Sequence, residues 1–143
     1  MIDDLYHVSE LHHDGDNATC LVKLHADHEI YRAHFPGQPV TPGVILLQVA
    51  CQLLGKVIGQ SLEIVAVKNV KFLAVVSPVD NPQVNFSFSH IQADEQGFSA
   101  RVEVKSLAGN TLVKISFCAT PTSPPQSPLR GGGPVIMTMN NEQ

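Results

Sequence analysis

The residues that could do chemistry lie in one short segment, residues 34–43, which reads His-Phe-Pro-Gly-Gln-Pro-Val-Thr-Pro-Gly. Three prolines and two glycines in ten residues predict a rigid loop, because both residue types favour turns and proline fixes φ. His34 is the titratable group of the segment. A histidine titrates close to neutral pH, so it can remove an acidic proton from the carbon next to a carbonyl group.

This loop leads into a helix that the sequence predicts from about Pro42 to Gly59. Thr41 suits the N-cap and Pro42 the first helical position. The helix is apolar nearly all round, so the rest of the chain must enclose it on most sides. Gly43 falls in the first turn, where backbone N–H groups lack acceptors and the helix dipole is positive. A thioester carbonyl placed there would be polarised, as in an oxyanion hole.

Most of the remaining chain has the pattern of strands. Apolar and polar residues alternate in residues 18–26, 84–89, 100–105 and 113–118, and residues 62–72 are rich in Val and Ile. Residues 94–97 and 109–110 carry hairpin signals between the last three of these strands. An antiparallel sheet that curls around one long helix is therefore expected, with a two-layer α+β sandwich as the alternative.

A single sheet around one helix leaves an edge strand and one helix flank uncovered. Pairing two copies of the chain would cover both, so we expect a dimer.

Composition narrows the class of protein. The chain has 143 residues, 43% hydrophobic and 15% charged, as in an ordinary globular domain. The net charge of −4 gives no basic field, so nucleic acid is not an expected partner. Cys20, Cys51 and Cys118 are far apart and odd in number, which argues against disulfides and a Cys zinc site and favours a reducing compartment.

The sequence also gives expectations for the location of the protein and for the bounds of its domain. The first residues have no basic and apolar signal, and the most apolar stretch, residues 44–58, is too short and polar to span a bilayer. We therefore expect a cytoplasmic location and no membrane partner. Residues 1–120 are predicted to form the domain. Residues 121–143 begin with a Pro/Gly-rich stretch and are predicted to be a tail, disordered or loosely docked.

Residues 34–44 resemble the signature of the 3-hydroxyacyl-[acyl-carrier-protein] dehydratases, roughly H-F-P-G-H-P-x-M-P-G-V-L, followed after two residues by Glu or Asp. Eight positions within eleven match in unbroken register: His34, Phe35, Pro36, Gly37, Pro39, Pro42, Gly43 and Val44. A weaker likeness extends over residues 5–119. The resemblance implies an α+β hot-dog fold, a dimer, and a lyase of fatty-acid or related lipid and polyene biosynthesis.

The resemblance also implies roles for single residues. His34 would be the base that takes the C2 proton, and the Gly43 N–H would bind the thioester oxygen. Phe35, Pro42 and Val44 would line the substrate site. The site would be built across the dimer, with an apolar tunnel for the acyl chain. No cofactor or metal of its own is implied, since phosphopantetheine of the acyl carrier protein carries the substrate.

Gln48 departs from the signature, because the family has a carboxyl group at this position. An amide can hold a water or hydroxyl but does not exchange protons near pH 7, and a lost general acid typically costs about 10²–10⁴-fold in rate. His34 would then serve both proton transfers, or a related chain would supply Glu or Asp in a heterodimer. The chain could otherwise be an impaired acyl-binding subunit. A hot-dog thioesterase is less favoured, because residues 44–54 hold no Asp or Glu.

Other polar residues are given structural interpretations. His25 and His28 have the spacing of metal ligands but are expected in a surface loop, and His12 with His13 in a solvated turn. Gln52, one turn after Gln48, is expected to be structural. Arg32 is expected at the surface, with an acidic carrier protein or a phosphate as the alternative contact.

Overall fold

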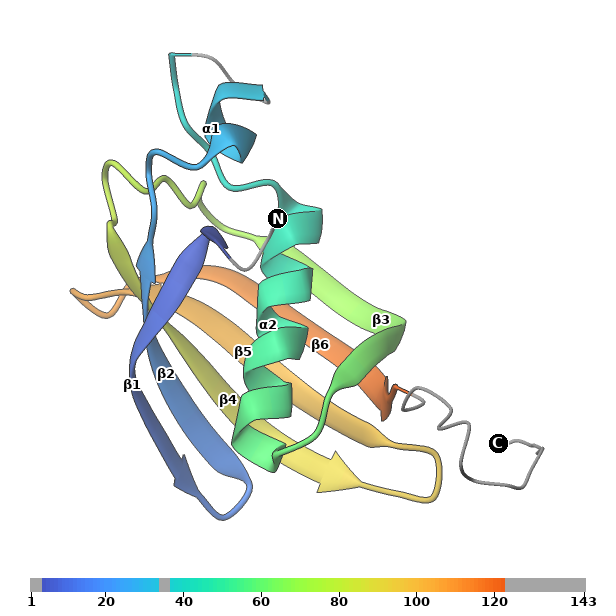
Figure 1. The fold of residues 1–143 in the computed structure, drawn as a ribbon. Helices are drawn as coiled ribbons and strands as arrows, with labels where there is room; N and C mark the ends of the chain where they lie inside the picture. Colours follow the sequence, from blue (N-terminus) through green and yellow to red (C-terminus); the bar gives the residue numbers. More distant parts are fainter. Residues whose placement is uncertain (1–3, 34–36, 123–143) are drawn as a thin grey trace.

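A computed structural model describes residues 4–33 and 37–122 (Figure 1). These residues form two helices and one six-stranded antiparallel sheet of order β1-β2-β4-β5-β6-β3. The elements are β1 Tyr6–Asp14, β2 Asn17–Leu24, α1 Glu29–Ala33, α2 Gly43–Ile58, β3 Leu62–Phe72, β4 Gln83–Ala93, β5 Phe98–Ser106 and β6 Thr111–Pro121.

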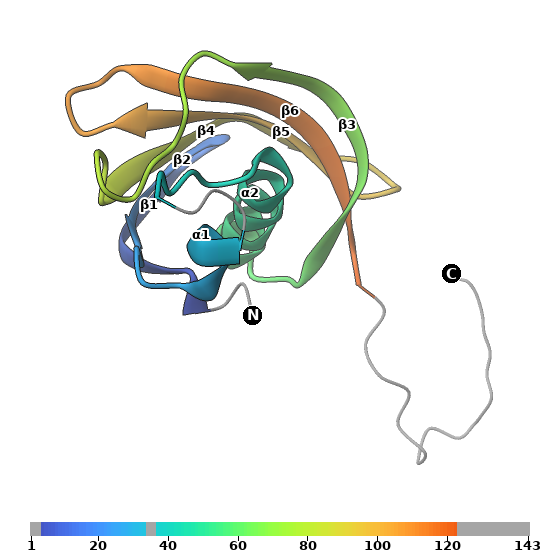
Figure 2. The ribbon, with the colours of Figure 1, turned by 90° about the horizontal axis from the view of Figure 1, so that it is seen from above.

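The sheet curls around α2, so that the helix lies in the hollow of a curved wall (Figure 2). Alternate residues of the strands face this hollow and are buried, as the two-residue period requires. The core contains, among others, Cys20, Val22, Leu46, Leu53, Leu54, Phe86, Phe88, Val102 and Phe117. The predicted wrap of an antiparallel sheet around one apolar helix is confirmed.

One row of residues, paired from strand to strand, runs across five strands. It shows where the part of the sheet that is covered by α2 ends. Cys20, Phe86, Val104 and Val113 lie side by side in register on β2, β4, β5 and β6, and all four are fully buried. The next residue of the row is Phe72 on β3, which is 58% exposed. The far end of β3 therefore lies at the margin of the part of the sheet that α2 covers, beside Gly43 at the start of the helix.

The two strands at the ends of the sheet order, β1 and β3, each have one neighbour only. On β3, Val65 and Val67 are exposed, and so is Val44 on α2. These side chains form an apolar flank along one side of the molecule. The expectation that this fold leaves an edge strand and a helix flank uncovered is confirmed for a single copy of the chain.

The ends of α2 differ in one detail from the prediction. The N-cap is Pro42, in an extended conformation, and no side chain caps the helix. Thr41 was expected to cap it, but its hydroxyl is turned away into a buried contact with Tyr31. At the other end, Gly59 has φ 87° in the left-handed region and its N–H bonds the Gly55 carbonyl, as a C-terminal glycine does.

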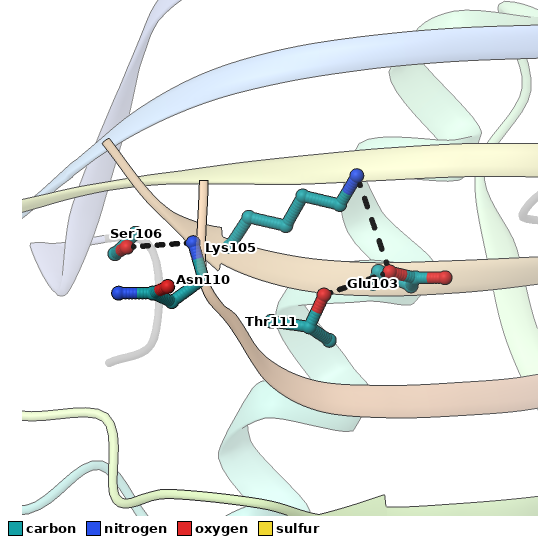
Figure 3. Close-up of polar contacts among 5 residues, drawn as sticks. All are labelled: Glu103, Lys105, Ser106, Asn110 and Thr111. Atoms are coloured by element: carbon teal, nitrogen blue, oxygen red, sulfur yellow. Dashed lines mark hydrogen bonds and ion pairs between the residues drawn. The ribbon is translucent and has the colours of Figure 1, made fainter. Parts of the chain in front are cut away.

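Both predicted hairpins are present. Between β4 and β5, the Asp94 carboxylate accepts hydrogen bonds from the backbone N–H groups of Gln96 and Gly97. Between β5 and β6, the Ser106 hydroxyl accepts a bond from the Asn110 N–H, and the Thr111 hydroxyl donates to Glu103 (Figure 3). The last three strands therefore form the meander that their sequence predicts.

Two local predictions need correction. Residues 6–14 form β1, so exposed His12 and His13 lie on a strand rather than in a turn. The short helix α1 was not predicted. The three cysteines are free: Cys20 and Cys51 are buried, and Cys118 is half-buried.

The last strand, β6, ends at Pro121, which pairs with Leu62 on β3. Most of the predicted tail, residues 123–143, lies outside the described residues. Within residues 4–33 and 37–122, no helix is long and apolar enough to cross a membrane.

The packing around Gly55, near the end of α2, can be tested by a single substitution. A Cβ built on buried Gly55 would lie 2.5 Å from the backbone oxygen of Gln60, so the backbone would have to shift. Alanine normally stabilises a helix by about 1 kcal/mol relative to glycine, but overpacking costs about 1–3 kcal/mol. We expect Gly55→Ala to lower the free energy of unfolding in urea by about 1–2 kcal/mol. Exposed Lys56→Ala is the control, and a more stable Gly55→Ala protein would contradict the packing described.

Candidate functional site

The predicted catalytic loop is anchored on both sides by described residues, although His34, Phe35 and Pro36 themselves lie outside the described residues. On the near side, α1 buries Tyr31, whose hydroxyl lies 3.0 Å from the hydroxyl of Thr41. On the far side, the Thr41 N–H donates to the Val76 carbonyl at 2.8 Å. The entry of the chain into α2 is therefore fixed by two buried contacts.

A hollow of about 410 Å³ lies at the amino end of α2. It is lined by Val40, Thr41, Pro42, Gly43, Leu46, Phe72, Leu73, Ala74, Val75 and Val76. A Cβ built on Gly43 would lie 2.5 Å from the tip of the Phe72 ring, so the ring lies directly against the backbone of Gly43. Gly43 is the first residue of α2, and its N–H belongs to the turn that has no intrahelical acceptor. An amide donor thus stands beside an apolar hollow.

A second hollow, of about 480 Å³, lies along the uncovered flank between α2 and β3. We call it the flank groove, and its lining residues are Val44, Leu47, Gln48, Cys51, Gln52, Leu62, Glu63, Ile64 and Val67. Gln48 is exposed there, five residues and roughly 7.5 Å of helix rise beyond Gly43. Pro42 and Gly43 therefore line the hollow at the amino end of α2, while Val44 and Gln48 line the flank groove.

Gln52 also reaches a third hollow of about 810 Å³ between β1 and the second half of α2. Its amide oxygen accepts a hydrogen bond from the Tyr6 hydroxyl at 2.6 Å. This bond ties β1 to the helix, which agrees with the structural role predicted for Gln52. The described site candidates Pro42, Gly43, Val44 and Gln48 do not line this hollow.

His25 and His28, which lie outside the motif, both make contacts with the backbone. The Nδ1 atom of His25 lies 2.8 Å from the Asp4 carbonyl, and the Nδ1 atom of His28 accepts from the Ile30 N–H. Both follow β2 in a turn, as predicted. Arg32 donates to the Asp27 carbonyl at 3.0 Å. Among the described residues, no group of three His, Cys, Asp or Glu side chains has the arrangement of a metal site.

Three buried groups have shifted pKa values. Burial raises the pKa of the Cys20 thiol to about 11, with Lys56 lowering it slightly, and burial also raises the pKa of Tyr31. Burial raises the pKa of the Cys51 thiol, and the negative charge of Glu63 raises it further. Glu63 was not singled out from the sequence. The available signal was a carboxylate at the second position of a strand that is otherwise rich in Val and Ile.

Comparisons with known proteins place this geometry in a family. A family model described as ApeI dehydratase, ApeI-like, matches residues 10–110. The 3-hydroxyacyl-[acyl-carrier-protein] dehydratase FabZ of Levilactobacillus brevis is 34% identical over 73 residues, 46% of this chain and 49% of that protein. FabZ of Rickettsia felis is 29% identical over 97 residues, 62% of this chain and 65% of that protein. The chain thus spans about half to two thirds of these relatives.

Solved structures support the same fold at low sequence identity. The dehydratase heterocomplex ApeI:P from Xenorhabdus doucetiae has a TM-score of 0.58 at 17% identity, covering 80% of this chain and 96% of that chain. A hypothetical thioesterase with coenzyme A from Streptococcus pneumoniae has a TM-score of 0.58 at 12% identity, covering 83% and 87%. The fold is therefore the hot-dog fold, as predicted. Because the family model covers more than half of the residues, the chain belongs to the ApeI-like dehydratase family.

The buried contact between Tyr31 and Thr41 can be tested by a double-mutant cycle. Removing one hydroxyl, by Tyr31→Phe or Thr41→Val, leaves the other buried without this partner, which typically costs about 1–3 kcal/mol. We expect the double variant to be destabilised by less than the sum of the single variants, by at least about 0.5 kcal/mol, in chemical unfolding. Strictly additive effects would contradict a direct contact that anchors the loop.

Proposed function

We propose that this chain interconverts 3-hydroxyacyl and 2-enoyl thioesters carried on an acyl carrier protein, with His34 as the base. The single observation that carries the proposal is the apolar hollow at the amide end of α2, at the point where the sequence segment that begins with His34 leads into the helix. The family match and the FabZ relatives support the reaction class. A thioester and its acyl chain need the same two features, a donor for the carbonyl oxygen and an apolar surface for the chain.

The proposed dehydration follows from these parts. The thioester oxygen accepts a hydrogen bond from the Gly43 N–H, which stabilises the negative charge that develops on it. His34 removes a proton from C2, the double bond forms between C2 and C3, and the hydroxyl leaves C3 as water after taking up a proton. Phe35, Pro42 and Val44 are proposed to contact the substrate. Gln48 is proposed to hold the departing hydroxyl by hydrogen bonds.

The complete site is proposed to form between two chains. The β3 edge and the flank groove leave Val44, Val65 and Val67 exposed in a single copy, and a second chain would cover them. The family resemblance implies that the second chain would supply His34 to the site that contains Gln48. The proposed assembly is a homodimer, or a heterodimer with a related dehydratase chain.

A second candidate function is that of an acyl-binding subunit in a heteromeric dehydratase. Gln48 is the observation that favours it, because the family signature has a carboxyl there. The similar structure from Xenorhabdus doucetiae is itself a dehydratase heterocomplex, ApeI:P. In that case the chain alone would bind acyl thioesters, and hydration would require the partner chain.

The role of His34 can be tested with crotonyl thioester, monitoring both hydration and release of free thiol. We expect hydration without thiol release, and His34→Gln should lower the hydration rate by about 10²–10⁴-fold. His25→Gln is the matched control, because His25 lies outside the loop, where its ring contacts the Asp4 carbonyl and the ring of His7. Thiol release as the main reaction would instead indicate a thioesterase, and activity that depended on an added partner would favour the subunit function.

The proposed pairing is tested by the mass of the protein in solution. Val67 is 43% exposed on the flank, and Leu107 is 61% exposed in the β5–β6 hairpin. A charge at Val67 would be buried without a partner in the dimer. Light scattering after size exclusion should report a monomer for Val67→Lys and a dimer for both the wild type and Leu107→Lys. A Val67→Lys protein that remained dimeric would place the interface elsewhere.

A further inference from the structure

The outer face of the sheet carries a cluster of positive charge over β3, β5 and β6. Arg101 and Lys105 on β5 and Lys114 on β6 each have a buried neighbour on both sides in the strand, so their side chains point away from α2. Lys71 on β3 lies directly opposite Lys114 and shares this face. We call these four residues the outer cationic face.

The charge of this face differs from that of the chain as a whole. The chain has nine Lys and Arg and thirteen Asp and Glu, and four of the nine lie together here. Among the described residues that pair directly with these four, Glu103 is the only carboxylate, and the remaining partners are Lys, Ser, Thr or Asn. A chain that is acidic overall therefore presents a locally positive surface.

The one carboxylate in this cluster is engaged by other groups. The Oε1 atom of Glu103 accepts a hydrogen bond from the Thr111 hydroxyl at 3.0 Å and lies 4.0 Å from the Nζ atom of Lys105 (Figure 3). Within residues 4–33 and 37–122, no ion pair engages Lys71, Arg101 or Lys114, and all three are exposed. Three positive charges of this face are therefore without a counter-charge.

Two of these charges repel each other across the sheet. Lys71 and Lys114 are direct partners in the β3–β6 register, which places their Cβ atoms about 4.5–5.5 Å apart. Like charges directly opposite each other destabilise a sheet. An anionic group bound over the pair would relieve this repulsion, so the pair favours an anionic partner at the expense of the free fold.

The outer cationic face begins beside the amino end of α2. Lys71 immediately precedes Phe72, whose ring lies against Gly43 and lines the hollow at that end of the helix. From Lys71 the face crosses β6 to β5 on the outside of the curved wall, over about 10 Å (Figure 2). A partner on this face would therefore sit next to the opening of the proposed substrate site.

We propose that the outer cationic face is the docking surface for an acidic protein, namely the carrier that bears the acyl thioester. This inference rests on the proposed function, in which a carrier protein delivers the substrate. The residues around the charges are Ser, Thr and Asn, so the face offers charge and hydrogen bonds without an apolar centre. Such a surface steers a charged partner and releases it again, as a carrier requires after each turnover.

The experiment measures binding of a fluorescently labelled, acidic acyl carrier protein that bears a saturated butyryl group. In the full-length double variant Lys71→Glu/Lys114→Glu, the association rate should fall by about 10-fold or more, because electrostatic steering is lost. The control Lys23→Glu/Lys56→Glu has the same net charge and changes two exposed lysines elsewhere, so it should bind like the wild type. Added salt should weaken wild-type binding.

Unfolding in urea separates docking from a merely structural role. The single variant Lys71→Glu replaces a like-charge pair with an opposite-charge pair, so its urea midpoint should lie above that of the wild type. Its affinity for the carrier should nevertheless be lower. A structural role of Lys71 would instead lower the urea midpoint, and that result would overturn the proposal. Light scattering checks that each variant has the same assembly as the wild type.

A carrier-free substrate distinguishes this inference from the function on which it rests. Hydration of the crotonyl thioester of N-acetylcysteamine should be equal in the wild type and in Lys71→Glu/Lys114→Glu. If both double variants bind the carrier equally, or if the wild type binds phosphatidylserine vesicles in place of the carrier, the docking proposal fails and the dehydratase function stands. A wild type that binds the carrier through these lysines but hydrates neither crotonyl substrate would support the docking face and contradict the dehydratase function.

Discussion

The structure depends on the burial of one apolar helix by one curved sheet. Helix α2 has seven buried residues on its core side, and the strands β2, β4, β5 and β6 supply the buried side chains that face it. Burying this surface is the main source of stability for such a fold. It also fixes the direction of the helix, and therefore the place where its first amide groups meet the solvent.

The same constraint explains why the functional residues gather at one end and one flank. Six strands do not enclose the helix completely, so β3 and one stripe of α2 remain uncovered in a single chain. The amino end of α2 lies beside the end of β3, where Phe72 packs on Gly43. A substrate that is polar at one point and apolar along its length would find a donor at the helix end and an apolar wall along the flank.

Much of this architecture could be predicted from the sequence. Strand β3 was predicted with its observed limits, and both hairpins were identified, because period-two patterns and turn residues are local signals. Strand β1 was not predicted, since only a few of its residues are buried and its polar histidines resemble a turn. Thr41 was assigned as a cap because its contact with Tyr31, ten residues away, cannot be read from local sequence.

The candidate site was predictable in part for similar reasons. Gly43, Pro42 and Gln48 could be proposed as site residues because they belong to one continuous segment that resembles a known signature. The flank groove itself was not predicted, because β3 reaches α2 only through the curl of the sheet. A residue whose function comes from tertiary proximity has no local pattern that would identify it.

The central claim is that an acyl thioester binds with its carbonyl oxygen against the amide end of α2. The most direct measurement is the isotope-edited infrared spectrum of a saturated thioester, labelled with ¹³C at the carbonyl carbon, when it is bound to the protein. We expect the carbonyl band to move to lower wavenumber on binding, because the Gly43 N–H would polarise the bond. A bound thioester whose carbonyl band stays at its position in water would contradict it.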